Sequence, residues 1–234
     1  WDQLQLGQTN GDLFSRRVLR SFHPQRSGDL EILLEPNWIR QARGTTHGTP
    51  YSYDSHIPLL LHPHPSRVLV IGMGSAITLG SAGRHPGVTT LDCAEIDPAV
   101  VEGARLFGEH NYHVHDDSRA RIFVADGRNF LLANQEQYDV IISEPSNPWM
   151  AGLAYLFTEE FYHLCKQRLA SGGLMGQWIQ LYRISPDDVK LLVKTFQKVF
   201  PYVSVWSTIP GDLLLVGSLE PQQLDYEHLK HQLA

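Results

Sequence analysis

Short apolar runs, separated by stretches with helical periodicity, dominate the chain from residue 67 onward. Residues 67–71 and 138–143 are almost wholly apolar and rich in β-branched side chains, which is typical of strands buried on both faces. Residues 98–107 instead place apolar side chains at helical spacing, with Pro98 in the first turn. The pattern predicts strands at 67–71, 88–95, 121–125, 138–143, 174–181, 203–206 and 213–216, and helices at 98–107, 127–133, 158–169 and 185–199.

Strands that alternate with helices predict a doubly wound α/β fold, with a Rossmann-like, mostly parallel seven-stranded sheet covered on both faces. Residues 61–234 are expected to form this domain. Residues 1–60 show no long helical period and contain strand-like pieces such as 30–34, so they predict a small β-rich N-terminal region. Gly172 and Gly173 are expected to end the helix over 158–169. Any ligand is expected at the carboxyl ends of the strands.

Composition and charge narrow the classes of function. Nineteen Lys and Arg residues against 25 Asp and Glu residues give a formal charge of -6, which argues against binding to nucleic-acid phosphates. Cys93 and Cys165 lie in apolar patterns and the histidines are scattered, so no metal is expected. No signal peptide is visible, and no apolar run approaches the roughly 20 residues that a membrane span requires, so a cytoplasmic location is expected. The chain begins at Trp1 rather than Met, which fits a piece of a longer protein.

Two glycines and an acid follow the first two expected strands. Gly72 and Gly74 would let a ligand approach the backbone at a helix N-terminus, although glycines also form simple turns. Glu95 ends the second strand at a distance suited to the hydroxyls of a ribose; the alternative is a solvated acid. Position 77 holds Ile77 rather than the third glycine of a dinucleotide motif, which favours a nucleoside such as S-adenosylmethionine over a phosphate-rich ligand.

Two further carboxylates follow the third and fourth expected strands. Asp126 precedes Gly127, and the pair could receive an adenine ring; Asp126 is equally suited to cap the following helix. Glu144 opens a loop with two prolines and Trp149, where an acid could accept a proton from an amine and an indole could contact a cation. The alternatives are that Glu144 caps the loop through backbone N–H groups, and that Trp149 is a buried wedge against Tyr155.

These motifs, in this order, resemble those of the spermidine synthases, which are polyamine aminopropyltransferases with a methyltransferase-like fold. The resemblance covers roughly residues 50 to 217 and is closest to a divergent branch with a Ser-Glu-Pro-Ser-Asn-Pro-Trp loop. The matching segments are 68–74, 95–97, 126–127, 138–142, 156–162 and 169–177.

The resemblance implies a role for each nucleoside-site residue. Gly72 and Gly74 would form the nucleoside turn, Glu95 would bind the ribose, and Asp126 with Gly127 would bind the adenine. The donor would be decarboxylated S-adenosylmethionine, or S-adenosylmethionine itself, and the acceptor a small polyamine-like amine.

The same resemblance implies an acceptor site around the fourth strand. Glu144 occupies the place of the family's catalytic Asp, Gln177 that of a Gln lining the amine pocket, and His56 that of a His before the first strand. Asn147 stands where the family has a second Asp that binds the amine, and Trp149 would contact the cation.

The departures from the family pattern leave three functions open. Ser75 replaces an Asp that contacts the aminopropyl end of the donor, and the usual Tyr-His-Glu is not cleanly present around residues 50–52. The first function is aminopropyl transfer, the second is N-methyl transfer from S-adenosylmethionine, and the third is non-catalytic nucleoside binding. A homodimer is expected.

Overall fold

The structure, a computed structural model, describes residues 31–33, 62, 64–146, 148–150, 152–181, 184–207 and 211–222. The chain divides into two units, Trp1–Glu31 and Ile32–Ala234, and the strands from residue 67 onward and the site below belong to the second. The candidate residues His56 and Asn147 lie outside the described residues, as does most of the region 1–60, whose assignment as a separate β-rich region stays a prediction.

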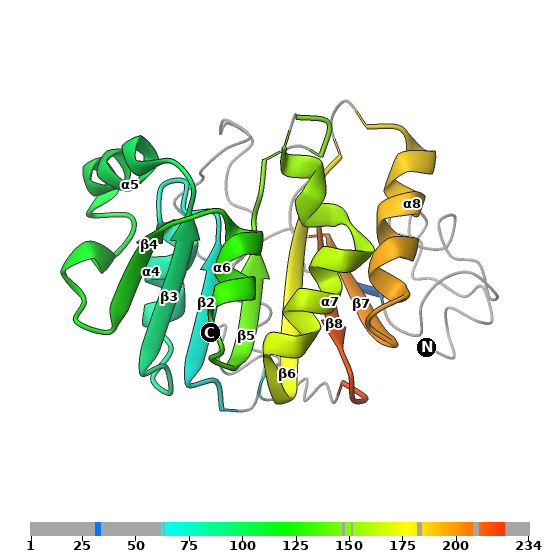
Figure 1. The fold of residues 1–234 in the computed structure, drawn as a ribbon, viewed down its shortest axis with the longest axis horizontal. Helices are drawn as coiled ribbons and strands as arrows, with labels where there is room; N and C mark the ends of the chain where they lie inside the picture. Colours follow the sequence, from blue (N-terminus) through cyan, green and yellow to red (C-terminus); the bar gives the residue numbers. More distant parts are fainter. Residues whose placement is uncertain are drawn as a thin grey trace, which may run out of the picture. The chain divides into compact units, whose positions relative to one another are not determined.

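One mixed sheet forms the centre of the fold (Figure 1). Its order is β1-β7-β8-β6-β5-β2-β3-β4, with β2 to β6 parallel and β8 antiparallel to both β6 and β7. The strands are β1 (Glu31–Leu33), β2 (Arg67–Ile71), β3 (Thr90–Glu95), β4 (Ala120–Val124), β5 (Tyr138–Ser143), β6 (Leu169–Gln180), β7 (Tyr202–Ser207) and β8 (Asp212–Ser218). The strand order reverses between β2 and β5, which places the topological switch point there.

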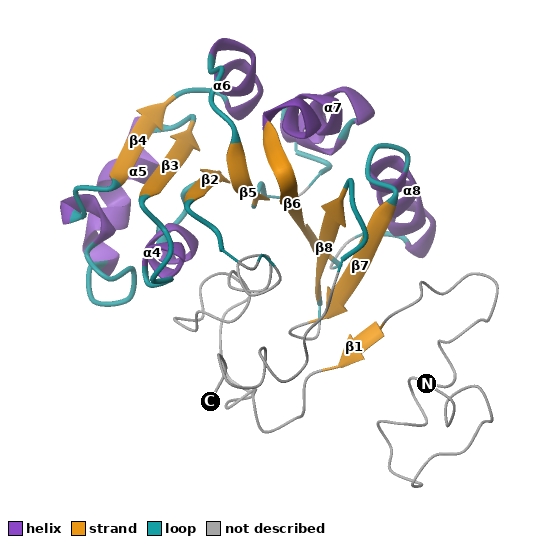
Figure 2. Cartoon of the chain, turned by 90° about the horizontal axis from the view of Figure 1, so that it is seen from below, coloured by secondary structure: helices purple, strands orange, loops and turns teal. Residues whose placement is uncertain are grey.

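Helices cover both faces of this sheet (Figure 2). One face carries α4 (Ile77–Gly83) and α5 (Pro98–Ala104); the other carries α6 (Gly127–Ala133), α7 (Glu159–Arg168) and α8 (Pro186–Gln197). Short 3-10 turns follow α5 and precede β4 and α7, namely η2 (Arg105–Phe107), η3 (Val114–Asp116) and η4 (Leu153–Phe157). The prediction of a doubly wound α/β fold with a mostly parallel sheet is therefore confirmed.

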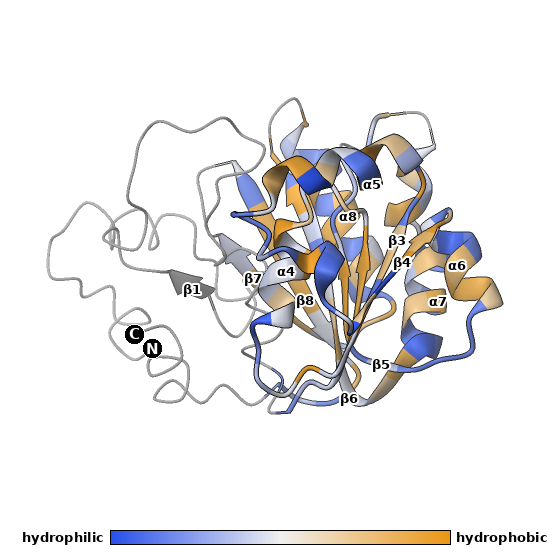
Figure 3. Cartoon of the chain, turned by 90° about the vertical axis from the view of Figure 1, so that its left-hand side faces the viewer, coloured by the Kyte–Doolittle hydropathy of each residue, from blue (hydrophilic) through white to orange (hydrophobic). Residues whose placement is uncertain are grey.

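Strand side chains alternate between two apolar clusters, and the apolar interior is visible in Figure 3. Val140 and Ile142 of β5 pack with α4 residues such as Leu79, whereas Ile141 packs with α7 residues such as Phe161. The same alternation indicates toward which face of the sheet a residue just after a strand points.

Side-chain caps explain where several helices begin. Asp97 accepts a hydrogen bond from Ala99 N (2.8 Å) and Pro98 occupies the first position of α5. Ser185 caps α8 through Asp188 N (3.1 Å).

The prediction that Gly172 and Gly173 end a helix is wrong. The helix α7 ends at Arg168, Leu169 is already extended, and β6 runs through both glycines. The register between β5 and β6 shifts at this point, and Gly172 has φ +73°. The glycines therefore serve a strand irregularity, which glycine permits as readily as a helix end.

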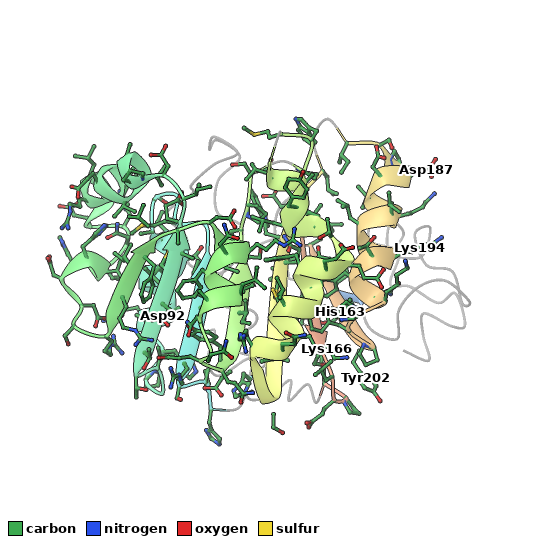
Figure 4. The ribbon with its side chains drawn as sticks, viewed as in Figure 1. Asp92, His163, Lys166, Asp187, Lys194 and Tyr202 are labelled. Carbon is green, nitrogen blue, oxygen red and sulfur yellow. The ribbon has the colours of Figure 1, made fainter. Side chains whose placement is uncertain are left out.

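A buried carboxylate in β3 belongs to the framework. Asp92, labelled in Figure 4, is fully buried and accepts hydrogen bonds from Arg121 (2.6 and 2.7 Å) and from the Tyr138 hydroxyl (2.6 Å). Burial, together with Asp92, raises the pKa of the Tyr138 phenol above its usual range. Because the strands are parallel, this group links the first halves of β3, β4 and β5, away from their carboxyl ends.

Candidate functional site

The glycine turn after β2 has a left-handed backbone at alternate residues. Gly72, Gly74 and Ala76 have φ of +89°, +50° and +60°. A Cβ on Gly72 would lie 2.9 Å from the carbonyl oxygen of Glu144, so only glycine fits there. The turn and the loop after β5 are thus pressed together at the switch point, and α4 begins directly after the turn.

The carboxylate of Glu95 holds this turn from below. Its Oε2 accepts a hydrogen bond from Met73 N (2.8 Å) and its Oε1 accepts one from Asp97 N (2.9 Å). Glu95 is 8% exposed, which rules out the alternative of a solvated acid. Each carboxylate oxygen has a second lone pair with which it could accept a ligand hydroxyl.

Asn111 is a turn-supporting residue that sequence reasoning missed. It is fully buried, and its Nδ2 donates to Ser75 O (3.0 Å) and Ala104 O (2.8 Å). Tyr112 and His113 follow with φ of +56° and +52°. An asparagine followed by two left-handed residues in a polar loop carries no recognisable spacing, so only the three-dimensional contacts reveal it.

Asp126 and Gly127 begin α6 at the carboxyl end of β4. Asp126 Oδ1 accepts a hydrogen bond from Asn129 N (2.9 Å), so the capping role foreseen as an alternative is present. A Cβ on Gly127 would lie 2.4 Å from Cγ2 of Ile71, so this glycine is required for packing of the helix on β2. Contact of either residue with an adenine stays a prediction.

Glu144 lies directly beyond β5 and points toward α4. Its backbone N donates to Ile71 O (3.0 Å), and its Oε2 accepts a hydrogen bond from the hydroxyl of Thr78 on α4 (2.6 Å). Burial raises the pKa of the Cys93 thiol in β3, and the charges of Glu95 and Glu144 raise this pKa further. Both carboxylates therefore act on one small region at the switch point. Thr78 is a second residue that sequence reasoning missed.

Trp149 lies in the loop after Glu144 and is 45% exposed. Tyr155 in η4 is 61% exposed. The alternative of a buried wedge between these rings is therefore wrong, and the indole remains accessible to a ligand.

Gln177 emerges on the face of the sheet opposite to Glu144. It lies between Met175 and Ile179, which pack with α7, and its Nε2 donates to the carbonyl oxygens of Ser143 (3.4 Å) and Trp178 (3.1 Å). Glu144 instead is bonded to α4. Gln177 therefore lies next to the end of β5, but its amide and the Glu144 carboxylate point to opposite faces of the sheet.

Two absences apply to the described part of the chain. None of its helices combines the length and apolar character of a membrane span. Its His, Cys, Asp and Glu side chains form no group of three or more that could hold a metal ion.

Comparison with known proteins identifies the family. Residues 52–214 match the spermine/spermidine synthase domain. Polyamine aminopropyltransferase of Thermotoga neapolitana is 34% identical over 152 residues, which are 65% of this chain and 51% of that protein. Spermidine synthase of Dictyostelium discoideum is 32% identical over 215 residues, 86% of this chain and 74% of that protein. The chain therefore belongs to the spermine/spermidine synthase family.

Solved structures agree with this placement. A spermidine synthase in complex with the transition state analogue AdoDATO has a TM-score of 0.65 and 32% identity, over 70% of this chain and 58% of the other. Human methyltransferase-like protein 13 in complex with SAH has a TM-score of 0.59 at 21% identity, over 75% and 82% of the two chains, and shows likeness of fold alone. The chain spans about half the length of the first curated relatives it matches.

Proposed function

We propose that this protein transfers an aminopropyl group from decarboxylated S-adenosylmethionine to an amine, with Glu144 as the catalytic base. The observation that carries the proposal is the contact between the glycine turn and the Glu144 loop, with the carboxylate held by Thr78 at 2.6 Å. A nucleoside bound over Gly72 would present its sulfonium next to this carboxylate. The relatives named above support this choice of reaction.

The chemistry follows from the charge of the two substrates. Alkylamines are mostly protonated at neutral pH, and only the neutral nitrogen can attack. Glu144 would accept the proton, and the nitrogen lone pair would then form a bond to the carbon next to the sulfonium. The carbon–sulfur bond breaks, its electron pair returns to sulfur, and methylthioadenosine leaves. Alignment of the two substrates would supply much of the rate, because effective molarity can contribute about 7–11 kcal/mol.

Two side chains would hold the donor. Glu95 is already fixed by two backbone N–H groups and could accept the ribose hydroxyls without reorganising. Asp126 would accept from the adenine amino group with the oxygen that does not cap α6. Ser75, in the same turn, would lie near the aminopropyl end. This assignment of donor residues is tested by donor binding to Glu95→Gln, which we expect to be at least tenfold weaker.

A product assay tests the reaction. The protein is incubated with decarboxylated S-adenosylmethionine or S-adenosylmethionine, each with a diamine, and nucleoside products are identified by mass spectrometry. We expect methylthioadenosine, and we expect Glu144→Gln to lower its rate by about 10²–10⁴-fold, the usual contribution of a general base. Glu102→Gln, at an exposed acid of α5, is the matched control. S-adenosylhomocysteine as the product would instead establish methyl transfer.

The assembly and location are proposed on the same basis. We expect a homodimer in the cytoplasm, with light scattering of the purified protein and fractionation of cells as the measurements. A monomer that is fully active would contradict the first of these predictions.

A further inference from the structure

One hydrogen bond joins the glycine turn to the loop that follows α5. The Nδ2 group of Asn111 donates to Ser75 O (3.0 Å) in the turn, and it also donates to Ala104 O (2.8 Å) at the end of α5. Asn111 is fully buried, and its Oδ1 has no hydrogen-bond partner among the described residues. The orientation of the amide is therefore fixed, because the opposite orientation would place Oδ1 against two carbonyl oxygens.

Left-handed backbone is concentrated at the two ends of this bond. Within the described part of the chain, the non-glycine residues with positive φ are Ala76, Tyr112 and His113. Ala76 directly follows the acceptor of the bond, and the other two directly follow its donor. Such a backbone is costly for a residue with a Cβ, and it gathers at active sites, ligand clamps and switch segments. The place where the turn meets the loop is therefore a candidate for a functional role.

Asn111 fixes the last peptide of the turn, as Glu95 fixes an earlier one. Met73 N donates to Glu95 Oε2 (2.8 Å), and Met73 O accepts from Ala76 N (2.7 Å). The peptide between Ser75 and Ala76 thus supplies both the N–H that closes the turn and the C=O that Asn111 holds. Reversal of this peptide plane would relax Ala76 to a negative φ but would break both hydrogen bonds.

The backbone around Asn111 holds its side chain in place. Asn111 N donates to Phe107 O (2.9 Å), and Asn111 O accepts from Val114 N (3.2 Å). A Cβ on Gly80 of α4 would lie 2.0 Å from Asn111 O, so α4 packs directly on the backbone of the loop. The amide is therefore positioned by the loop and by α4 before it bonds to the glycine turn.

We propose that Asn111 is a positioning residue for the donor, because its bond to Ser75 O holds the glycine turn in the conformation that receives the nucleoside. The inference deepens the proposed function and rests on it. If the peptide after Ser75 rotated, Met73 O would lose its partner, and Met73 N is the group bound by the proposed ribose ligand Glu95. Loss of the Asn111 amide is therefore expected to weaken donor binding and to leave the proton transfer unchanged.

The variant Asn111→Leu tests this role. Leucine is also branched at Cγ, and it removes an Oδ1 that has no partner, so the loss is confined to the two bonds from Nδ2. We expect KM for decarboxylated S-adenosylmethionine to rise about fivefold to tenfold, while kcat and KM for the amine stay within about twofold. Asn111→Ala, which adds no volume, takes its place if thermal unfolding shows that the leucine variant does not fold.

An asparagine of the framework provides the matched control. Asn134 is half-buried and donates to the Tyr138 hydroxyl (2.7 Å) at the amino end of β5. Asn134→Leu should lower the thermal stability without changing KM for the donor. An equal rise of the donor KM in Asn134→Leu and Asn111→Leu would show a general loss of structure and would overturn the positioning role.

A glycine at position 76 separates the two bonds of Asn111. Glycine adopts the φ of +60° found at Ala76 without strain, so this substitution removes the tendency of the peptide to rotate. In Asn111→Leu combined with Ala76→Gly, the donor KM should return to within about twofold of that of Ala76→Gly alone. The lost bond to Ala104 O is not replaced by this glycine. A donor KM that rises equally with and without the glycine would overturn the inference.

Hydrogen exchange separates a failure of this inference from a failure of the proposed function. The amide of residue 76 bonds to Met73 O, and its protection is measured without substrate. We expect this protection to fall at least about tenfold in Asn111→Leu and to recover with Ala76→Gly. Unchanged protection in Asn111→Leu, with an active wild type, would overturn the inference and leave the proposed function standing. If protection falls as expected but the wild type does not bind decarboxylated S-adenosylmethionine in a calorimeter, the proposed function is overturned, and the donor role of Asn111 with it.

Discussion

At the residue scale, the contact between Thr78 and Glu144 joins the helix that follows the glycine turn to the proposed base. The hydroxyl on the first turn of α4 donates to one carboxylate oxygen at 2.6 Å, which is a short bond of the charge-assisted kind. A glutamate side chain has three rotatable bonds, and this bond fixes its far end. In the proposed reaction, we expect Thr78 to be a positioning residue that orients the Glu144 carboxylate.

Replacing this hydroxyl tests the positioning role. Thr78→Val keeps the shape of the side chain but removes the bond, and hydrogen bonds to charged groups are worth about 1.5–3 kcal/mol. We expect kcat for aminopropyl transfer to fall about tenfold or more with little change in KM for the donor, and Thr78→Ser to restore most of it. Steady-state kinetics of the three proteins provide the measurement. A loss of donor affinity at unchanged kcat would show that Thr78 acts on the turn and not on Glu144.

Some site residues could be predicted from the sequence and others could not. Gly72 and Glu95 stand out because an apolar strand, a glycine turn and an acid at a second strand end have few arrangements in an α/β fold. Thr78 and Asn111 act through contacts between distant segments, and no local pattern marks them. Gln177 illustrates the limit, since a shift of one residue along a strand changes the face on which a side chain emerges.

At the element scale, the close packing of α6 on β2 depends on one glycine. Gly127 is buried, and a Cβ there would lie 2.4 Å from the side chain of Ile71. Gly103 in α5 has nothing within 4 Å of the corresponding position. The two helices are therefore expected to respond to the same substitution in opposite ways.

An alanine at each position makes this contrast measurable. Gly127→Ala should lower the free energy of unfolding by about 1–3 kcal/mol, because overpacking forces the helix or Ile71 to move. Gly103→Ala should raise it by about 0.4–1 kcal/mol, because alanine restricts the unfolded chain and favours helix. Urea unfolding of both variants is the measurement. If Gly127→Ala raised the free energy of unfolding as Gly103→Ala is expected to do, α6 would be able to move away from Ile71 without cost.

The positions of the elements followed from the sequence more closely than their ends did. The strands at β2 and β5 match the predicted ranges, because fully buried parallel strands give uninterrupted apolar runs. The boundary between α7 and β6 did not follow, because Gly172 and Gly173 signal a helix end as strongly as a strand irregularity. The 3-10 turns after α5 likewise carry no distinct pattern.

At the scale of the whole molecule, charged groups at the two ends of the parallel strands have different roles. The proposed site lies at the carboxyl ends of the strands, with Glu95 and Glu144 around the switch point. At the amino ends, Asp139 accepts hydrogen bonds from Ser66 N (2.8 Å) and Arg67 N (2.9 Å). The charge of Asp139 also acts on the buried imidazole of His62. Protonation of His62 should therefore affect folding without acting on the proposed site.

The imidazole of His62 makes this separation testable. Burial lowers its pKa, and the charge of Asp139 opposes the shift only in part. The unfolded chain then binds more protons than the folded one below a pH of about 6.5, so the stabilisation is complete above that value and is lost as the pH falls through the folded pKa. One such group changes the free energy of unfolding by at most about 1.4 kcal/mol per pH unit. Urea unfolding between pH 8 and pH 5 should show a smaller decline for His62→Gln than for the wild type. His110→Gln is the control, because His110 is exposed and is not among the groups that act on His62. Donor binding should be the same in all three proteins. A variant that lost it would show that the amino ends of the strands influence the proposed site at their carboxyl ends.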